Sequence, residues 1–134
     1  MRSFTLKIVT PDGTVYDGQA ESLTVRTTTG DLGILAGHTN LVAPLGQGRC
    51  AIHIDGKRRF AACIGGMVTV MQGNVTLIPT TFEWAEDIDI ARAEKSFERA
   101  QKILNSKDAT KADLALAEAR LKRALVRKGV ANTN

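Results

Sequence analysis

Aromatic residues are scarce in this chain of 134 residues, because Phe, Trp and Tyr together make up only 4% of it. A hydrophobic core must therefore be built mainly from aliphatic side chains. No apolar run approaches the roughly 20 residues that span a bilayer. No signal-peptide pattern stands at the start of the chain, so we expect any membrane association to run through a partner. The two cysteines, Cys50 and Cys63, fit a reducing compartment better than a disulfide framework, and a bond between them would need one particular hairpin register.

Motifs for catalysis and metal binding are also missing. The sequence holds neither a P-loop nor a Gly-x-Gly-x-x-Gly fingerprint. Its two histidines, His38 and His53, lie far apart with no serine or cysteine motif, and together with the cysteines they lack the paired spacing of a zinc site. A basic run over residues 120–128 has no interleaved aromatic residues, which disfavours nucleic acid as a ligand. We therefore expect no enzyme, no metal and no nucleic-acid partner.

Glycine and proline are distributed unevenly along the chain. Eleven of the twelve glycines and all three prolines lie at or before Pro79, and Ala, Leu, Lys, Arg and Glu dominate afterwards. Short alternating segments with turn signals between them predict a β-sandwich or barrel in the first part. The later composition favours helix. We place the boundary between a sandwich over residues 1–84 and a helical region over residues 85–134.

Two helices are expected after this boundary. Apolar residues recur at intervals of three and four along residues 89–104 and again from about residue 110 to Lys128, with Gly129 as a natural stop. Thr110, with Asp113 three residues on, suggests a capping box for the second helix. The expected seams are Ile90, Ala93, Phe97, Ala100 and Leu104 in the first helix, and Leu114, Ala117, Leu121 and either Ala124 or Leu125 in the second. A short connection implies an antiparallel hairpin, and seams rich in alanine predict one of marginal stability.

Arginines in both helices fall at related levels of this hairpin. With the turn centred near residues 107–108, Arg92 lies level with Arg123 and Ile88 lies near Arg127, while Arg99 follows two turns after Arg92. Several guanidinium groups around the single carboxylate of Asp89 would suit a phosphate-bearing ligand. The alternative is that these arginines point to solvent on separate faces and bind nothing.

Several short motifs, taken in order, point to one family. They are Thr10-Pro11-Asp12-Gly13, Val15-Tyr16-Asp17-Gly18, Gly30-Asp31-Leu32-Gly33-Ile34-Leu35, Gly37-His38, Gly65-Gly66 and Asp87-Ile88-Asp89. Each motif alone is weak, but their order and spacing resemble the epsilon subunit of bacterial F-type ATP synthase over nearly the whole chain.

The resemblance implies a ten-stranded β-sandwich followed by an α-helical hairpin. It also implies a non-catalytic subunit of the central stalk, at the cytoplasmic face of the bacterial cell membrane. By the same resemblance, the sandwich would hold the gamma subunit and rest on the c-ring. The hairpin would reach the beta and alpha subunits when extended and inhibit ATP hydrolysis, and it would permit turnover when folded down.

Members of the family that bind ATP as a regulatory ligand, not as a substrate, carry the motif [Ile/Leu]-Asp-x-x-Arg-Ala on the hairpin. Residues 88–93 satisfy it through Ile88, Asp89, Arg92 and Ala93. The resemblance further assigns phosphate contacts to Arg99, Arg123 and Arg127, the base end of the nucleotide to Glu83, a c-ring contact to Asp31 and a stalk contact to His38. Two rival hypotheses are a free-standing nucleotide sensor and a small hydrolase of phosphate esters.

Overall fold

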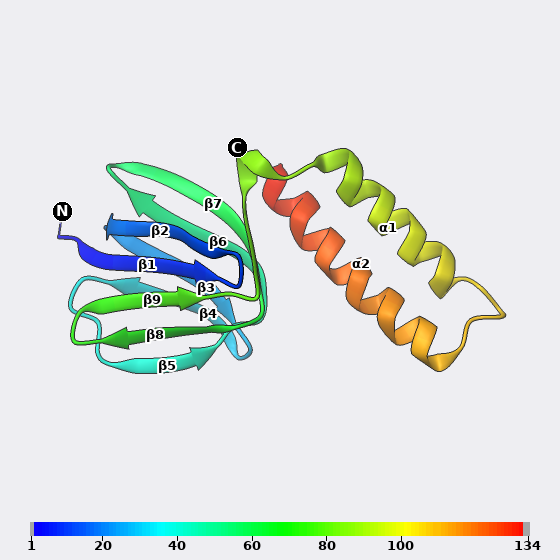
Figure 1. Ribbon diagram of the computed structural model, residues 1–134, viewed down its shortest axis with the longest axis horizontal. Coiled ribbons are helices and arrows are strands. Elements are labelled where there is room, and N and C mark those ends of the chain that lie inside the picture. Colours follow the sequence, from blue (N-terminus) through cyan, green and yellow to red (C-terminus); the bar gives the residue numbers. More distant parts are fainter. Residues whose placement is uncertain (1, 133–134) are drawn as a thin grey trace. The chain divides into compact units, whose positions relative to one another are not determined.

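The computed structural model describes residues 2–132, which divide into two compact units. The first unit ends at Trp84 and is built of strands, and the second begins at Ala85 and is helical (Figure 1). The expected fold class, ten strands in a sandwich followed by two helices, is therefore confirmed.

The sandwich consists of two five-stranded sheets. The strand order of the first sheet is β2-β1-β9-β8-β5, in which β1 pairs in parallel with β9 and the other neighbours are antiparallel. The strands of this sheet are β1 (Phe4–Thr10), β2 (Gly13–Ala20), β5 (Leu41–Pro44), β8 (Met67–Met71) and β9 (Asn74–Ile78). The second sheet is antiparallel, with the order β10-β7-β6-β3-β4. Its strands are β3 (Ser22–Thr27), β4 (Gly30–Leu35), β6 (Gln47–Ile54), β7 (Lys57–Ile64) and β10 (Thr81–Trp84).

The core lies between the two sheets and follows the alternation of side chains along each strand. On β1, for example, Phe4, Leu6 and Ile8 are buried while Thr5 and Lys7 are exposed. Phe4 contributes an aromatic ring, and the other fully buried members of this core are aliphatic residues or cysteines, as the composition predicts.

Both cysteines are buried on the inner face of the second sheet and are free thiols. Cys50 stands opposite Ala61, while Cys63 stands opposite Gly48, so the register does not place the two thiols directly across from each other. Burial raises the pKa of Cys63 to about 12 and the pKa of Cys50 well above its usual value, with the neighbouring Cys63 thiol adding to the second shift. These thiols are therefore core residues that stay protonated.

Two glycine positions illustrate how tight turns set the strand register. Asp55 and Gly56 both have positive φ, 51° and 75°, as the two-residue hairpin between β6 and β7 requires. Gly66 has φ +92°, and a Cβ there would overlap the carbonyl oxygen of Ile78 and stand 2.8 Å from the Cα of Pro79. Only glycine fits at this second position, both for its backbone conformation and for lack of space.

The helical unit contains a short 3₁₀ turn, η1 (Ala85–Asp87), followed by α1 (Ile90–Leu104) and α2 (Lys111–Ala131), which pack side by side (Figure 1). The capping box is present: Thr110 accepts from the backbone N–H of Asp113, whose side chain accepts from the N–H of Thr110. The expected stop at Gly129 is wrong, because α2 continues to Ala131 and the next residue, Val130, is buried. Tertiary packing of that valine outweighs the weak helix propensity of one glycine.

Small residues form the contact between the helices. Ala93 and Ala100 on α1 are buried and seven residues apart, and Ala117 and Ala124 on α2 repeat both features. The prediction that Ile90 belongs to the seam of α1 is wrong, since this residue is 46% exposed. Of the two residues predicted as alternatives for the seam of α2, Ala124 is buried and Leu125 is 50% exposed. No helix among the described residues is long and apolar enough to cross a membrane.

Candidate functional site

The site begins where the chain enters α1. Asp89 has φ −79° and ψ 100°, outside the helical region, and its carboxylate oxygen Oδ1 accepts from the backbone N–H of Arg92 at 3.0 Å. This is the geometry of an N-cap, which satisfies one of the four N–H groups that a helix leaves free at its start. Asp89 and Arg92 are therefore linked through the backbone of the first turn, and the side chain of Arg92 is exposed.

A surface depression of about 400 Å³ lies beside this first turn. It is lined by the N-cap residue Asp89 and by five residues of α1, which are Ala91, Arg92, Lys95, Ser96 and Arg99. The three cations follow one another at intervals of three and four residues, so they share one face of the helix over about two turns, or roughly 10 Å. With three cations and one carboxylate, which already caps the helix, the depression is suited to an anion with several charges.

Two polar residues of the depression, Lys95 and Ser96, were missed by the sequence analysis. The signal was available for Lys95, which lies three residues after Arg92 and four before Arg99, on the face that those two residues already define. Ser96 is half-buried and adds a neutral hydroxyl, which can donate or accept a hydrogen bond. Nothing in its spacing distinguished it from an ordinary surface serine.

The other hairpin residues assigned by motif occupy different positions. Arg123 and Arg127 lie four residues apart on α2, both half-buried, and neither lines the depression. Ile88 and Ala93 are buried, 8% and 2% exposed, so they pack the helical unit instead of facing the depression. The convergence of both helices' arginines on Asp89 thus stays a prediction.

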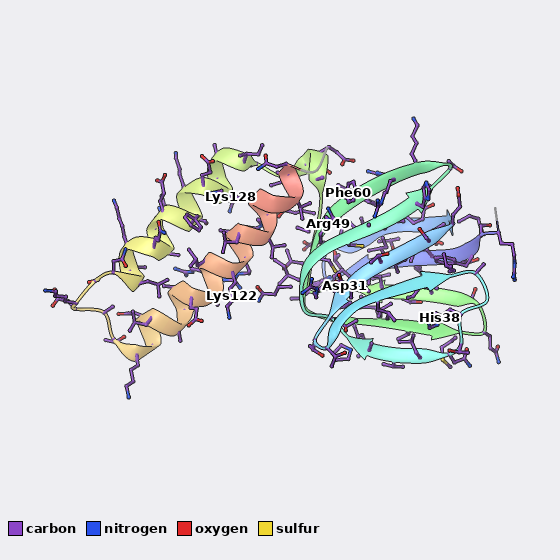
Figure 2. All side chains as sticks on the ribbon, turned by 180° about the vertical axis from the view of Figure 1, so that it is seen from behind. Asp31, His38, Arg49, Phe60, Lys122 and Lys128 are labelled. Atoms are coloured by element: carbon purple, nitrogen blue, oxygen red, sulfur yellow. The ribbon has the colours of Figure 1, made fainter. Side chains whose placement is uncertain are left out.

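The remaining assigned residues belong to the sandwich unit. Glu83 is half-buried on β10, opposite Ala62 of β7. Asp31 is exposed on β4 and forms an ion pair with Arg26, at 2.7 Å between Oδ1 and Nε. His38 follows β4, and its Nδ1 donates to the carbonyl oxygen of Thr39 at 2.7 Å. Figure 2 labels Asp31 and His38 at separate places on this unit.

A row of exposed apolar side chains crosses the outer face of the first sheet. The register aligns Pro44 of β5, Met67 of β8 and Ile78 of β9. Val42 and Met71 lie on the same faces of β5 and β8 but in other rows, opposite Thr69 and Asn74, and Val42 is 65% exposed. We call Val42, Pro44, Met67, Met71 and Ile78 the apolar patch. Contiguous exposed apolar surface of this kind marks an interaction site more often than an ordinary surface.

Comparisons with known proteins agree on one family. Residues 3–85 match the family described as "ATP synthase, Delta/Epsilon chain, beta-sandwich domain", and residues 86–132 match "ATP synthase, Delta/Epsilon chain, long alpha-helix domain". An ATP synthase epsilon chain from Ruminococcus albus is 41% identical over 133 residues, which are 98% of each chain. The epsilon chain from Bacillus subtilis is 46% identical over 106 residues, 79% of this chain and 80% of that one.

Two solved structures contain chains of similar fold. A chain of the Euglena gracilis mitochondrial ATP synthase, in a structure of OSCP, F1 and the c-ring, superposes with a TM-score of 0.84 at 25% identity, covering 95% of this chain and 80% of that one. A chain from the central stalk and c-ring of the Tetrahymena thermophila mitochondrial ATP synthase has a TM-score of 0.67 at 14% identity, covering 98% of both chains, and shows the fold alone.

A β-sandwich domain followed by an α-helical domain is the two-domain architecture of ATP synthase delta and epsilon chains. The chain belongs to the ATP synthase epsilon chain family, so the resemblance found in the motifs is confirmed. Residues 2–132 contain no group of three or more His, Cys, Asp or Glu side chains placed to hold a metal ion.

Proposed function

We propose that this chain is the regulatory, non-catalytic subunit of the central stalk in a bacterial F-type ATP synthase, at the cytoplasmic face of the cell membrane. Its sandwich holds the gamma subunit and rests on the c-ring, so it couples the rotor to the catalytic head. The exposed apolar patch supports this role, because leaving several large side chains such as Val42 and Met71 in water is unfavourable unless a partner covers them. Asp31 and His38 are the proposed contacts toward the c-ring and the stalk.

The hairpin is the proposed regulatory element, with ATP as its ligand and not its substrate. The single observation that carries this proposal is the depression on α1, where Arg92, Lys95 and Arg99 present cations along roughly 10 Å of one helix face. A triphosphate is a compact anion of several charges, and guanidinium groups can bind its oxygens through paired hydrogen bonds. Arg123 and Arg127 of α2 would complete the site when the helices close on the nucleotide, and Glu83 is the proposed contact of the base.

The same arginines suit a second anionic partner. In an extended hairpin they would face acidic surfaces of the beta and alpha subunits, and this contact would inhibit ATP hydrolysis. ATP bound to the folded hairpin would draw the equilibrium away from that state, because each ligand favours the conformation that it binds more tightly. The alanine seam of the hairpin supports such a switch, since buried alanines contribute little apolar area and leave the closed form marginal.

Calorimetry of the full chain with ATP tests the nucleotide proposal. Arg92→Ala should weaken ATP binding by about tenfold or more, because it removes a charged hydrogen-bond donor from the depression. Lys107→Ala is the control, since it removes one exposed positive charge from the connection between α1 and α2, outside the depression. Equal affinities in the Arg92 and Lys107 variants, or no binding of ATP to the unmodified chain, would contradict the proposal.

Copurification with the gamma subunit tests the assembly proposal. Met67→Lys places a charge in the middle of the apolar row and should abolish the association, whereas Thr14→Lys, on an exposed position of β2, should leave it intact. If neither change affects the association, the patch is not the interface.

A free-standing nucleotide sensor is the second candidate, favoured by the cationic depression considered alone. It would bind ATP yet never associate with gamma in the copurification experiment. A hydrolase of phosphate esters would release phosphate from the isolated chain, and we expect no release, since the lining of the depression offers no nucleophile paired with a general base.

A further inference from the structure

The outer face of the second sheet contains a trough whose floor is made of small side chains. The register places Gly33 of β4, Thr24 of β3 and Ala51 of β6 in one row, and Phe60 of β7 stands at the end of that row. These positions alternate with buried core residues along their strands, so they face away from the core. Ala51 is nevertheless only 6% exposed, because longer side chains from the neighbouring rows rise on both sides of it.

The rows on either side of this floor supply mostly polar and cationic walls. Two adjoining hollows of about 280 Å³ and 200 Å³ share Thr24, Ala51 and Arg58. The larger is further lined by Arg26, Asp31 and Arg49, and the smaller by Ser22 and His53. We call this pair of hollows the arginine trough. It belongs entirely to the sandwich unit and is separate from the depression on α1.

Two of its arginines are held by one aromatic ring. The guanidinium carbon of Arg49 lies 4.9 Å from the centroid of Phe60, and that of Arg58 lies 5.3 Å from it; Figure 2 labels Arg49 and Phe60 on the neighbouring strands. Neither arginine forms an ion pair with a carboxylate anywhere in residues 2–132. Contact with the ring restricts the guanidinium groups while their N–H donors stay available, so less entropy is lost when an anion binds.

The third arginine is fixed differently. Arg26 donates to Asp31 across the β3–β4 pair, at 2.7 Å from Nε to Oδ1, so the one carboxylate at the rim is already engaged. The stem of Arg26 crosses Gly48, where a Cβ would stand 2.7 Å from the Cβ of Arg26. Three guanidinium groups thus meet one carboxylate, and the trough keeps a surplus of positive charge.

We infer that the arginine trough binds a small oligophosphate anion. Arginine forks match phosphate oxygens, and the hydroxyl groups of Ser22 and Thr24 add neutral donors to the trough. The hollows are smaller than the roughly 300–1,000 Å³ that encloses a drug-sized ligand. Ala51 supplies the apolar surface in the lining of the two hollows, and this small side chain offers no pocket for a nucleobase. The ligand class is therefore pyrophosphate, tripolyphosphate or the phosphate chain of a nucleotide whose base stays outside.

An NMR titration of the full chain with pyrophosphate tests this site. The background variant carries Arg92→Gln and Arg99→Gln, so that the helical depression does not compete for the anion. The ionic strength is held constant with sodium chloride, because screening alone shifts signals of charged surfaces. The expected result is a set of saturable shifts at the backbone amides of Thr24, Ala51 and Arg58.

Single variants then assign the binding to the guanidinium groups. Arg49→Gln and Arg58→Gln should each weaken the apparent affinity by about tenfold, as expected for loss of a charged hydrogen-bond donor. Lys7→Gln is the matched control, because it removes one exposed charge from β1 in the first sheet and should change the affinity by less than about twofold. Unchanged far-ultraviolet circular dichroism shows that each variant is folded.

A parallel titration of ATP against tripolyphosphate, which has the same number of phosphate groups, separates the two sources of the same chemistry. ATP that saturates the same amides at lower concentration than tripolyphosphate would identify a nucleotide as the ligand, and the reverse order would identify a free oligophosphate. Shifts that rise linearly without saturation, or an equal loss of affinity in the Lys7 variant, would overturn the proposal. Because the background lacks the helical cations, failure here leaves the proposed ATP site on the hairpin untouched.

Discussion

Asp89 caps α1, and its replacement should reveal how the motif residue acts. Its carboxylate accepts from the N–H of Arg92 at 3.0 Å, and the first turn of α1 holds no other acidic residue. Loss of an N-cap costs about 1 kcal/mol, within a range of roughly 0.5–2. Loss of the negative charge beside the helix N-terminus costs a further 0.3–1 kcal/mol, approximately. Asp89→Ala removes both contributions, whereas Asp89→Asn removes only the charge, since asparagine caps about as well as aspartate.

Urea unfolding followed by far-ultraviolet circular dichroism measures this difference, because α1 and α2, of 15 and 21 residues, dominate the helical signal. We expect Asp89→Ala to lower the stability of the helical unit by about 1–2 kcal/mol, which changes its folded-to-unfolded ratio by roughly 5–30-fold. Asp89→Asn should lower it by less than about half of that amount. Equal losses in the two variants, or no loss in Asp89→Ala, would refute the capping argument.

ATP affinity measured on the same variants then separates two roles. If Asp89 acts by holding the first turn, the Asp89→Asn variant should bind ATP nearly as well as the unmodified chain. The Asp89→Ala variant should then lose ATP affinity to the extent that its helical unit is destabilised. If the carboxylate contacts the nucleotide directly, both variants should lose affinity alike. In the first case Asp89 is a positioning residue for Arg92.

Three further expectations follow from packing and burial. Gly66→Ala should destabilise the sandwich severely in thermal unfolding. Gly73→Ala is the control, because Gly73 has a similar positive φ but open space around it, and it should cost only about 1–3 kcal/mol. Similar losses of stability in the two variants would show that the collision at Gly66 is relieved. Ala100→Leu should overpack the helix contact and cost about 1–3 kcal/mol in the helical transition, and a stabilised hairpin would contradict the close alanine seam. Cys50 and Cys63 should resist a thiol reagent at pH 8 until the chain is unfolded, because their raised pKa values leave almost no thiolate; rapid labelling of the native protein would disprove their burial.

The helical hairpin shows which helix ends can be predicted from the local sequence pattern. The capping box at Thr110 and Asp113 and the start of α1 after Asp89 were predictable, because capping depends on residues three apart in the chain. The end of α2 was not, since Val130 is drawn into the packed unit and extends the helix past Gly129. Helix ends depend on what the last turn can bury, and that information is not local.

The two anion-binding sites that we propose differ in the same way. On α1, the face shared by Arg92, Lys95 and Arg99 follows from helical periodicity alone, so the sequence determined it even though Lys95 was overlooked. The arginine trough could not be found in this manner, because its lining comes from four strands of two separate hairpins, β3–β4 and β6–β7.

Arg58 and Phe60 share a face by alternation along β7, but only the strand register brings Arg49 onto the ring of Phe60 and sets Ala51 beside Thr24. The sequence by itself therefore determined the family, the order of strands and helices, and the cationic face of α1, all of which depend on short-range spacing. The tertiary structure decided which side chains meet across the sheets, because a shift of one residue in register would turn every one of them to the opposite face.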